Sequence, residues 1–282
     1  MLAAAVTGTA LLAGACGGSS LATSLSACGS GHIYWADIHG PAPIGRARLD
    51  GTDVTRKFIT GTAAPGMIAV SADYLYWANW SSGAIGRARL DGTDVNQRFI
   101  TGASSPVGVA IASGYIYWAN NAAGTIGRAR LDGTGVAQRF ITTAQANGPD
   151  AIAVGSGYIY WANDYNIGRA RLDGTDVDQG FIAVPYGPQG VAGLAVNSRY
   201  IYWTNEQGDE IGRARLDGTG ADQRFIAGAH SPDAMVVDSR CIYWANFGSG
   251  TIGRAWLNGT GVSQRFLSVL GHPRGVAVDL GR

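Results

Sequence analysis

The sequence contains little charge and no long apolar segment beyond its first residues. Charged residues make up 15% of the 282 residues, the formal net charge is +1, and lysine occurs once, at Lys57. A nucleic-acid-binding surface needs concentrated basic charge, so this composition argues against one. Past the apolar leader, no segment approaches the length of a membrane-spanning helix. A hydrophobic content of 46% is instead typical of a compact globular protein.

Sequence motifs of several enzyme classes are also missing. The chain has no nucleophile elbow and no phosphate-binding loop. The three cysteines, Cys16, Cys28 and Cys241, include no CxxC pair, and their odd number leaves their pairing open. We expect Cys28 to lie in a flexible segment. We expect Cys241, which stands where other copies of a repeat have tyrosine, to act as a small buried apolar residue.

Residues 1–30 differ in composition from the rest of the chain. An apolar run ends at Cys16 and is followed by a Gly/Ser-rich segment. The sequence Leu-Ala-Gly-Ala-Cys, ending at Cys16, resembles a bacterial lipobox, which implies lipidation of that cysteine. The same small residues would also serve as an ordinary signal-peptide cleavage site. We therefore expect export to the extracellular space or the cell envelope, with a lipid anchor at Cys16 as the one route of membrane attachment.

The rest of the chain, residues 31–282, repeats one phrase. The tryptophan of an Ile-Tyr-Trp or Leu-Tyr-Trp sequence recurs at intervals of 41 to 43 residues, at Trp35, Trp77, Trp118, Trp161, Trp203 and Trp244. Each unit contains four short apolar runs bounded by turn residues, which predicts four β-strands, named A to D in chain order. Units of this size must stack on their neighbours to bury both sheet faces. The sequence therefore predicts an all-β, six-bladed propeller of four antiparallel strands per blade, and a monomer.

The two ends of the repeated region complete one blade. The region begins with a strand of type B at residues 31–36 and ends with a strand of type A at residues 275–280. We expect the final strand to become the innermost strand of the first blade, because an unpaired sheet edge would otherwise remain.

The repeated residues resemble a known family. The sequence YIYWANNAAGTIGRARLDGT, starting at Tyr115, is similar to the YWTD repeat, the class B repeat of the low-density lipoprotein receptor family. The resemblance implies a six-bladed propeller that binds a protein, peptide or glycan outside the cell. The last residue of the family motif is aspartate, here present only at Asp37; the other copies have Asn79, Asn120, Asn163, Asn205 and Asn246.

Variation among the copies falls on one rim. Antiparallel strands place the B-to-C and D-to-A loops on one side of the ring and the A-to-B and C-to-D turns on the other. The C-to-D turns are near-copies, whereas the B-to-C loops differ, which favours the loop side as a binding surface. Trp80, Tyr165 and Phe247 lie in these loops. They either anchor a peptide or stack on a sugar, or each folds back over its own blade.

The residue after the proline that leads each A strand is expected to face the mouth of the central channel. This set is polar and of mixed charge: Gly66, Val107, Asp150, Gln189, Asp233 and Arg274. Asp150 and Asp233 are candidates to hold a divalent cation such as calcium, which prefers oxygen ligands. A water-filled channel without a metal is the alternative. No other cofactor is expected.

Three histidines support a different function. His39, His230 and His272 fall in loops of the variable rim near the ring closure, together with Asp37. Such residues could act as general acids and bases, or hold a metal, in an enzyme similar to propeller lactonases or streptogramin lyases that opens a small cyclic ester. Solvated loop histidines without a shared target are the alternative.

Arginines alternate along five of the six C strands in the sequence Ile-Gly-Arg-Ala-Arg, for example at Arg46 and Arg48, and the sixth keeps the first of the two at Arg254. They could form a surface for an anionic polymer. Because they recur in the blades, we expect them to serve the repeat itself, by bonding to an aspartate or a carbonyl group of a neighbouring blade.

Overall fold

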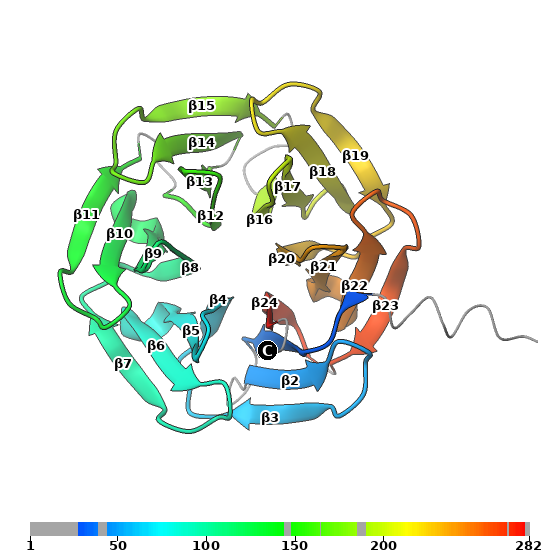
Figure 1. The fold of residues 1–282 in the computed structure, drawn as a ribbon, viewed down its shortest axis with the longest axis horizontal. Helices are drawn as coiled ribbons and strands as arrows, with labels where there is room; N and C mark the ends of the chain where they lie inside the picture. The colour runs from blue at the N-terminus through cyan, green and yellow to red at the C-terminus, as the bar shows by residue number, and fades with distance from the viewer. Residues whose placement is uncertain are drawn as a thin grey trace, which may run out of the picture.

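Six four-stranded antiparallel sheets surround a central axis (Figure 1). The structure is a computed structural model that describes residues 28–38, 44–143, 148–163, 165–184, 190–269 and 271–279. The first strand of each sheet lies nearest the axis, and each later strand lies farther out (Figure 1). The predicted six-bladed propeller is confirmed.

The strands of each blade follow one another from the axis outward. Blade 1 contains β24 (Pro273–Asp279), β1 (His32–Asp37), β2 (Ile44–Arg48) and β3 (Thr55–Ile59). Blade 2 contains β4 (Pro65–Val70), β5 (Tyr74–Asn79), β6 (Ala84–Arg89) and β7 (Asn96–Thr101). Blade 3 contains β8 (Pro106–Ala112), β9 (Tyr115–Asn120), β10 (Thr125–Arg130) and β11 (Ala137–Thr142).

Blades 4 to 6 have the same order. Blade 4 contains β12 (Ile152–Gly155), β13 (Tyr158–Ala162), β14 (Asn166–Arg171) and β15 (Asp178–Ala183). Blade 5 contains β16 (Val191–Val196), β17 (Tyr200–Asn205), β18 (Glu210–Arg215) and β19 (Asp222–Ala227). Blade 6 contains β20 (Pro232–Val237), β21 (Cys241–Asn246), β22 (Thr251–Trp256) and β23 (Ser263–Ser268). Single-turn 3₁₀ helices follow three of the second strands: η2 (Trp80–Ser82), η3 (Asn121–Ala123) and η4 (Phe247–Ser249).

The chain end completes the first blade, as predicted. Strand β24 pairs antiparallel with β1, with Trp35 opposite Val276 and Ile33 opposite Val278. The strand begins at Pro273, two residues before the predicted start. Blade 1 therefore contains residues from both ends of the described chain, and the ring is closed by backbone hydrogen bonds.

The repeated tryptophan accounts for the glycine of the Ile-Gly-Arg-Ala sequence. All six tryptophans are fully buried, and each lies across from the glycine of the adjacent third strand. In blade 1, a Cβ atom on Gly45 would overlap the ring of Trp35. Only glycine leaves room for the indole there, so the two residues recur together.

The asparagine that replaces the family's aspartate completes a buried amide network. In blade 3, Asn120 donates from Nδ2 to the carbonyl oxygen of Gln138 (2.8 Å) and accepts from the backbone N–H of Ser104 (2.9 Å). Trp118 donates to the side chain of Gln138 (3.1 Å), which in turn donates to Thr101 O in the preceding blade (2.8 Å). A carboxylate could not donate to Gln138, so the amide belongs to this network.

The arginines of the third strands join neighbouring blades. Arg128 lies between the rings of Tyr115 (4.7 Å from guanidinium carbon to centroid) and Phe140 (3.8 Å), and its Nη1 donates to Leu172 O of the next blade (3.3 Å). Corresponding bonds to leucine carbonyls are made by Arg46, Arg169, Arg213 and Arg254. The predicted structural role of this arginine is confirmed.

The cysteines correct one expectation. Cys28 and Cys241 form a disulfide, with Cα atoms 5.7 Å apart, and both residues are buried. The expectation that Cys28 lies in a flexible segment, and that Cys241 is merely a small apolar residue, is wrong. The bond ties the segment preceding blade 1 to β21 of blade 6, next to the ring closure.

No helix in the described part of the chain is long and apolar enough to cross a bilayer.

Candidate binding site at the channel mouth

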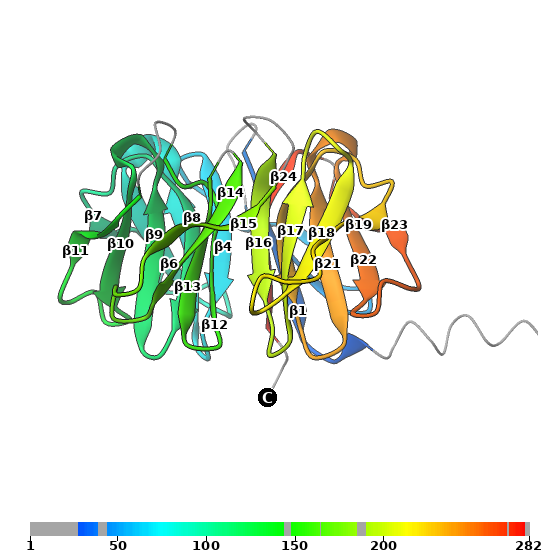
Figure 2. The same ribbon diagram turned by 90° about the horizontal axis from the view of Figure 1, so that it is seen from above.

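The ring has two unlike faces. We call the side with the B-to-C and D-to-A loops the loop face, and the side with the A-to-B and C-to-D turns the turn face. In the side view, the blue segment that leads into β1 lies on the turn face (Figure 2). On that face the turns are built alike: Asp132 Oδ1, for example, accepts from both the backbone and the hydroxyl of Thr134. The loop face carries the variable residues.

Residues that begin the innermost strands surround the channel mouth on the loop face. Two adjoining cavities of about 350 and 220 Å³ share Val107, Asp150 and Arg274 in their walls. Gly66 lines the first cavity and Asp233 lines the second. Five of the six residues expected at the mouth are thus brought together.

The sixth, Gln189, lies outside the described residues. In blade 5, Val191 pairs with Asn205 just as Pro232 pairs with Asn246 in blade 6. This register makes Ala192 the counterpart of Asp233, and Ala192 lines the second cavity.

A second set of side chains comes from the residue that follows β1, β5, β9 and β17. Ile38, Trp80 and Asn121 line the first cavity, and Glu206 lines the second. Of these, Trp80 was predicted from the sequence as a binding residue, whereas Asn121 and Glu206 were missed. The sequence does mark these two positions, because each directly follows the asparagine that ends a second strand.

The three loop aromatics differ in their surroundings. Trp80 is 53% exposed at the edge of the first cavity, and Tyr165 is 47% exposed. Phe247 is partly buried, with its ring centroid 5.0 Å from that of His272. Trp80 and Tyr165 therefore present large apolar surfaces to solvent, while Phe247 packs against a neighbouring loop.

An ion pair crosses the mouth between blades 6 and 1. Arg274 Nε lies 2.9 Å from Asp233 Oδ2. The Asp233 carboxyl is almost fully buried, and burial raises its pKa to about 7, against the opposing effect of Arg274. In the other direction, the charge of Asp233 raises the pKa of Arg274. Asp233 can therefore gain or lose a proton near neutral pH.

Two further carboxyl groups face the same guanidinium. Asp150 accepts a hydrogen bond from Asn121 Nδ2 (2.7 Å), and its charge acts on both Asp233 and Arg274. Burial raises the pKa of Glu206, and the charge of Arg274 opposes that shift. Three carboxyl groups thus share one cation, so the mouth has an excess of negative charge.

Only some of the residues predicted for the alternative, catalytic function lie beside one another. His272 Nδ1 is 3.1 Å from Phe247 O, and the backbone N–H of His272 donates to Asp37 Oδ1 (3.3 Å). His230 is exposed, and its backbone N–H donates to Asn246 (3.0 Å). His39 lies outside the described residues, as does Cys16. Within the described ranges, no group of three or more His, Cys, Asp or Glu side chains is placed to hold a metal ion.

Comparison with known proteins agrees with this architecture. Residues 73–111 match the family model described as low-density lipoprotein receptor repeat class B. The match spans one of the six copies of the repeat. No curated protein sequence matches it.

Solved structures resemble this propeller in fold. A chain of a nidogen/laminin complex has a TM-score of 0.73 at 19% identity, covering 89% of this chain and 98% of that one. A catalytically inactive virginiamycin B lyase from Staphylococcus aureus, with quinupristin, has a TM-score of 0.60 at 19% identity, covering 85% of each chain. At these identities the likeness concerns the fold.

Proposed function

We propose that this propeller is a binding protein that engages a protein or peptide through its loop face and places a basic side chain of that partner at the channel mouth. The observation that carries the proposal is the combination, in adjoining cavities, of an exposed indole at Trp80 with three carboxyl groups around one arginine.

The chemistry of the mouth selects the partner. A lysine or arginine side chain would place its charge near Asp150 and Glu206 and its methylene groups against Trp80 and Ile38. A neutral glycan would use the exposed aromatic rings but would leave the carboxyl groups without a counter-charge. The fold likeness to a chain of a nidogen/laminin complex adds support for a protein partner.

Peptides of random sequence displayed on phage test this function. The wild-type protein is expected to enrich peptides that carry lysine or arginine beside an apolar residue. The variant D150N/E206Q should bind the selected peptides at least about ten-fold more weakly, corresponding to about 1.4 kcal/mol. The control D53N/D94N makes the same charge change on the turn face, at two residues with φ of 53° and 52° that asparagine tolerates, and should bind normally. Enrichment of neutral sugars over basic peptides, or equal binding by D150N/E206Q, would reject the proposal.

A calcium ion held by Asp150 and Asp233 is the alternative occupant of the mouth. It would have to compete with Arg274 for Asp233. Thermal melting with and without millimolar calcium distinguishes a calcium site from a site for a basic side chain, because an ion that binds only the folded ring raises its melting temperature.

We also propose that the protein is exported to the cell surface or the medium. The disulfide between Cys28 and Cys241 supports an oxidising compartment. Mass spectrometry of the mature protein tests the route: a diacylglyceryl group on Cys16 indicates a lipid anchor, and an unmodified cleaved terminus indicates release. An uncleaved chain in the cytosol would contradict export.

A second candidate is a ring-opening enzyme of the lyase type. Two observations favour it: Asp233 can exchange a proton near neutral pH inside a cavity, and a virginiamycin B lyase shares the fold. Incubation with quinupristin, followed by mass spectrometry, is the test. Linearised product with the wild type, and none with D233A, would establish activity; intact substrate would dismiss this candidate.

A further inference from the structure

Among the described residues, Arg274 is the only cation in the walls of the channel mouth, and the repeat does not require it. The residues at the corresponding position in blades 2, 3 and 5 are uncharged: Gly66, Val107 and Ala192. The Arg274 side chain lies in the walls of both adjoining cavities and is 46% exposed, whereas the Asp233 side chain is 6% exposed. The bond to Asp233 therefore leaves much of the Arg274 side chain open to a ligand.

That bond occupies one of the three nitrogens of the Arg274 guanidinium group. Nε lies 2.9 Å from Asp233 Oδ2, and within the described ranges neither Nη atom has a hydrogen-bond partner. The planar guanidinium group can donate two parallel hydrogen bonds to the two oxygens of a carboxylate. Arg274 can therefore bind an incoming carboxylate through its Nη atoms without releasing Asp233.

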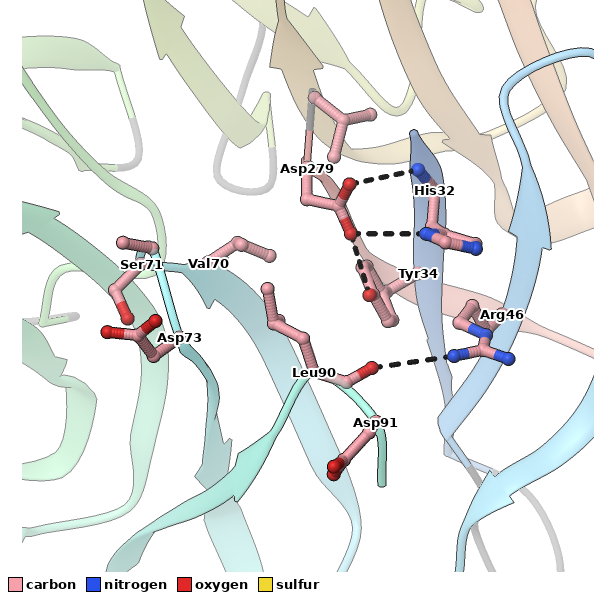
Figure 3. Close-up of a pocket in the computed structure, with 11 residues that line it drawn as sticks. His32, Tyr34, Arg46, Val70, Ser71, Asp73, Leu90, Asp91 and Asp279 are labelled. Carbon is pink, nitrogen blue, oxygen red and sulfur yellow. Dashed lines mark hydrogen bonds and ion pairs between the residues drawn. The ribbon is translucent and has the colours of Figure 1, made fainter. Parts of the chain in front are cut away.

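A cavity of about 770 Å³ on the turn face, between blades 1 and 2, shows the contrast (Figure 3). Arg46 in its wall donates from Nη1 to Leu90 O of blade 2 (3.4 Å). Asp279 in the same wall accepts from the Tyr34 hydroxyl (2.8 Å). These charged groups hold neighbouring strands and blades together, whereas Arg274 bonds to one carboxyl group and is exposed in both cavities of the mouth.

A carboxylate alone would be repelled from the mouth, because three carboxyl groups share one cation there. Glu206 lines the second cavity, and in the described part of the chain its carboxyl group makes no hydrogen bond. Asp150 lines both cavities, and Asn121 donates to its carboxyl group (2.7 Å). A ligand whose carboxylate binds Arg274 must therefore also bring a positive charge for Glu206 or Asp150.

We infer that the basic residue bound at the mouth is the carboxyl-terminal residue of the partner, a lysine or arginine whose free α-carboxylate binds the Nη atoms of Arg274. This inference rests on the function proposed above and adds the chain end to it. The side-chain cation lies near Asp150 and Glu206, and its methylene groups lie against Trp80. A basic residue inside a chain offers the same side chain but no carboxylate for Arg274, so it binds more weakly.

Titration calorimetry with synthetic peptides tests the inference on the wild-type protein. Acetyl-Ala-Phe-Lys with a free carboxylate should bind at least about ten-fold more tightly than the same peptide with a carboxyl-terminal amide. Equal binding of these two peptides would overturn the inference and leave the proposed function standing.

A third peptide tests the proposed function separately. Acetyl-Ala-Phe-norleucine with a free carboxylate lacks the side-chain cation, so it should bind at least about ten-fold more weakly than the lysine acid. Equal binding of the two acids, or failure of both lysine peptides to bind at millimolar concentration, would reject the basic side chain and with it the proposed function.

Variants of Arg274 locate the carboxylate. R274Q keeps a donor for Asp233 but removes the charge and the paired Nη donors, so the lysine acid and its amide should bind within about two-fold of each other. R274K keeps a charge beside Asp233 without the planar group, and should reduce the preference for the acid at least about three-fold.

R199Q is the matched control, because Arg199 is an exposed arginine in the turn between β16 and β17, on the turn face. This variant should keep the wild-type preference for the acid. A cooperative melting transition identifies the variants that are folded. A wild-type preference for the acid in folded R274Q or R274K would place the carboxylate elsewhere and reject the inference.

Discussion

Blades 2 to 5 pack differently from blades 1 and 6, which lie on either side of the ring closure and which we call the seam blades. In the regular blades, each arginine lies between a tyrosine and a phenylalanine and the blade depends on side chains that recur in its neighbours. At the seam that tyrosine is lost in both blades, and the ring is held by the β24–β1 pairing and the Cys28–Cys241 disulfide, with the Asp233–Arg274 contact beside them. Repetition stabilises the interior of the ring, whereas contacts that occur once stabilise its closure.

Removing the closing strand should have the largest effect. A chain ending at His272 lacks β24, which exposes the edge of β1 and the core residues Trp35 and Ile33. We expect loss of cooperative folding, measured as loss of the near-ultraviolet circular dichroism of the buried tryptophans. A sharp melting transition retained by this truncated chain would show that the regular blades need no closure.

Removing the disulfide should be the next largest change. The bond spans 213 residues, and the chain-entropy argument for such a loop gives about 5 kcal/mol. The double variant C28S/C241S should have a lower free energy of unfolding by up to that amount, measured by urea titration. Reductant should destabilise the wild type and leave the variant unaffected; equal sensitivity of both would contradict the assignment.

The contact between Asp233 and Arg274 should make the free energy of unfolding depend on pH. Because burial raises the pKa of Asp233 from 3.8 to about 7, the folded state binds this proton more tightly than the unfolded state. Stability from this group is therefore full below about pH 4 and is lost as pH rises through about 7, by at most about 4 kcal/mol. D233N should flatten this part of the curve of unfolding free energy against pH. An identical pH dependence in D233N would assign the effect to other groups.

A matched pair of substitutions compares a regular blade with a seam blade directly. N120D removes the donor to Gln138 O and buries a carboxylate, so it should cost about 2 to 3 kcal/mol of unfolding free energy. D37N, at the same motif position in blade 1, keeps an oxygen to accept from His272 N–H and should change stability by less than about 0.5 kcal/mol. Equal costs in chemical denaturation would mean that the seam position uses the same network as the others.

The fold could be predicted from the sequence because all six blades need the same packing and turn residues, so these residues recur at a regular interval. The pairing of a tryptophan with a glycine recurs in every blade, as does an Asp-Gly or Asn-Gly pair in the turn between the third and fourth strands. Contacts that occur once gave no such signal. Cys28 stands in a Gly/Ser-rich segment, where nothing local indicates that it reaches Cys241 on another blade.

The candidate site was predictable only in part for the same reason. Asp150, Asp233 and Arg274 follow prolines and could be placed by counting from them. In blade 5 the proline does not hold that position, so Gln189 was named where the register gives Ala192. The Asp233–Arg274 bond joins residues 41 positions apart, and its effect on proton affinity depends on burial that only the folded ring creates.

The described chain begins at Cys28, joined to the first residue of β21, and leaves β24 at Asp279, and both points lie on the turn face. A tether attached through either point would therefore hold the ring by its turn face. Trp80, Tyr165 and the carboxyl groups around Arg274 would then face outward, open to a partner arriving from solution.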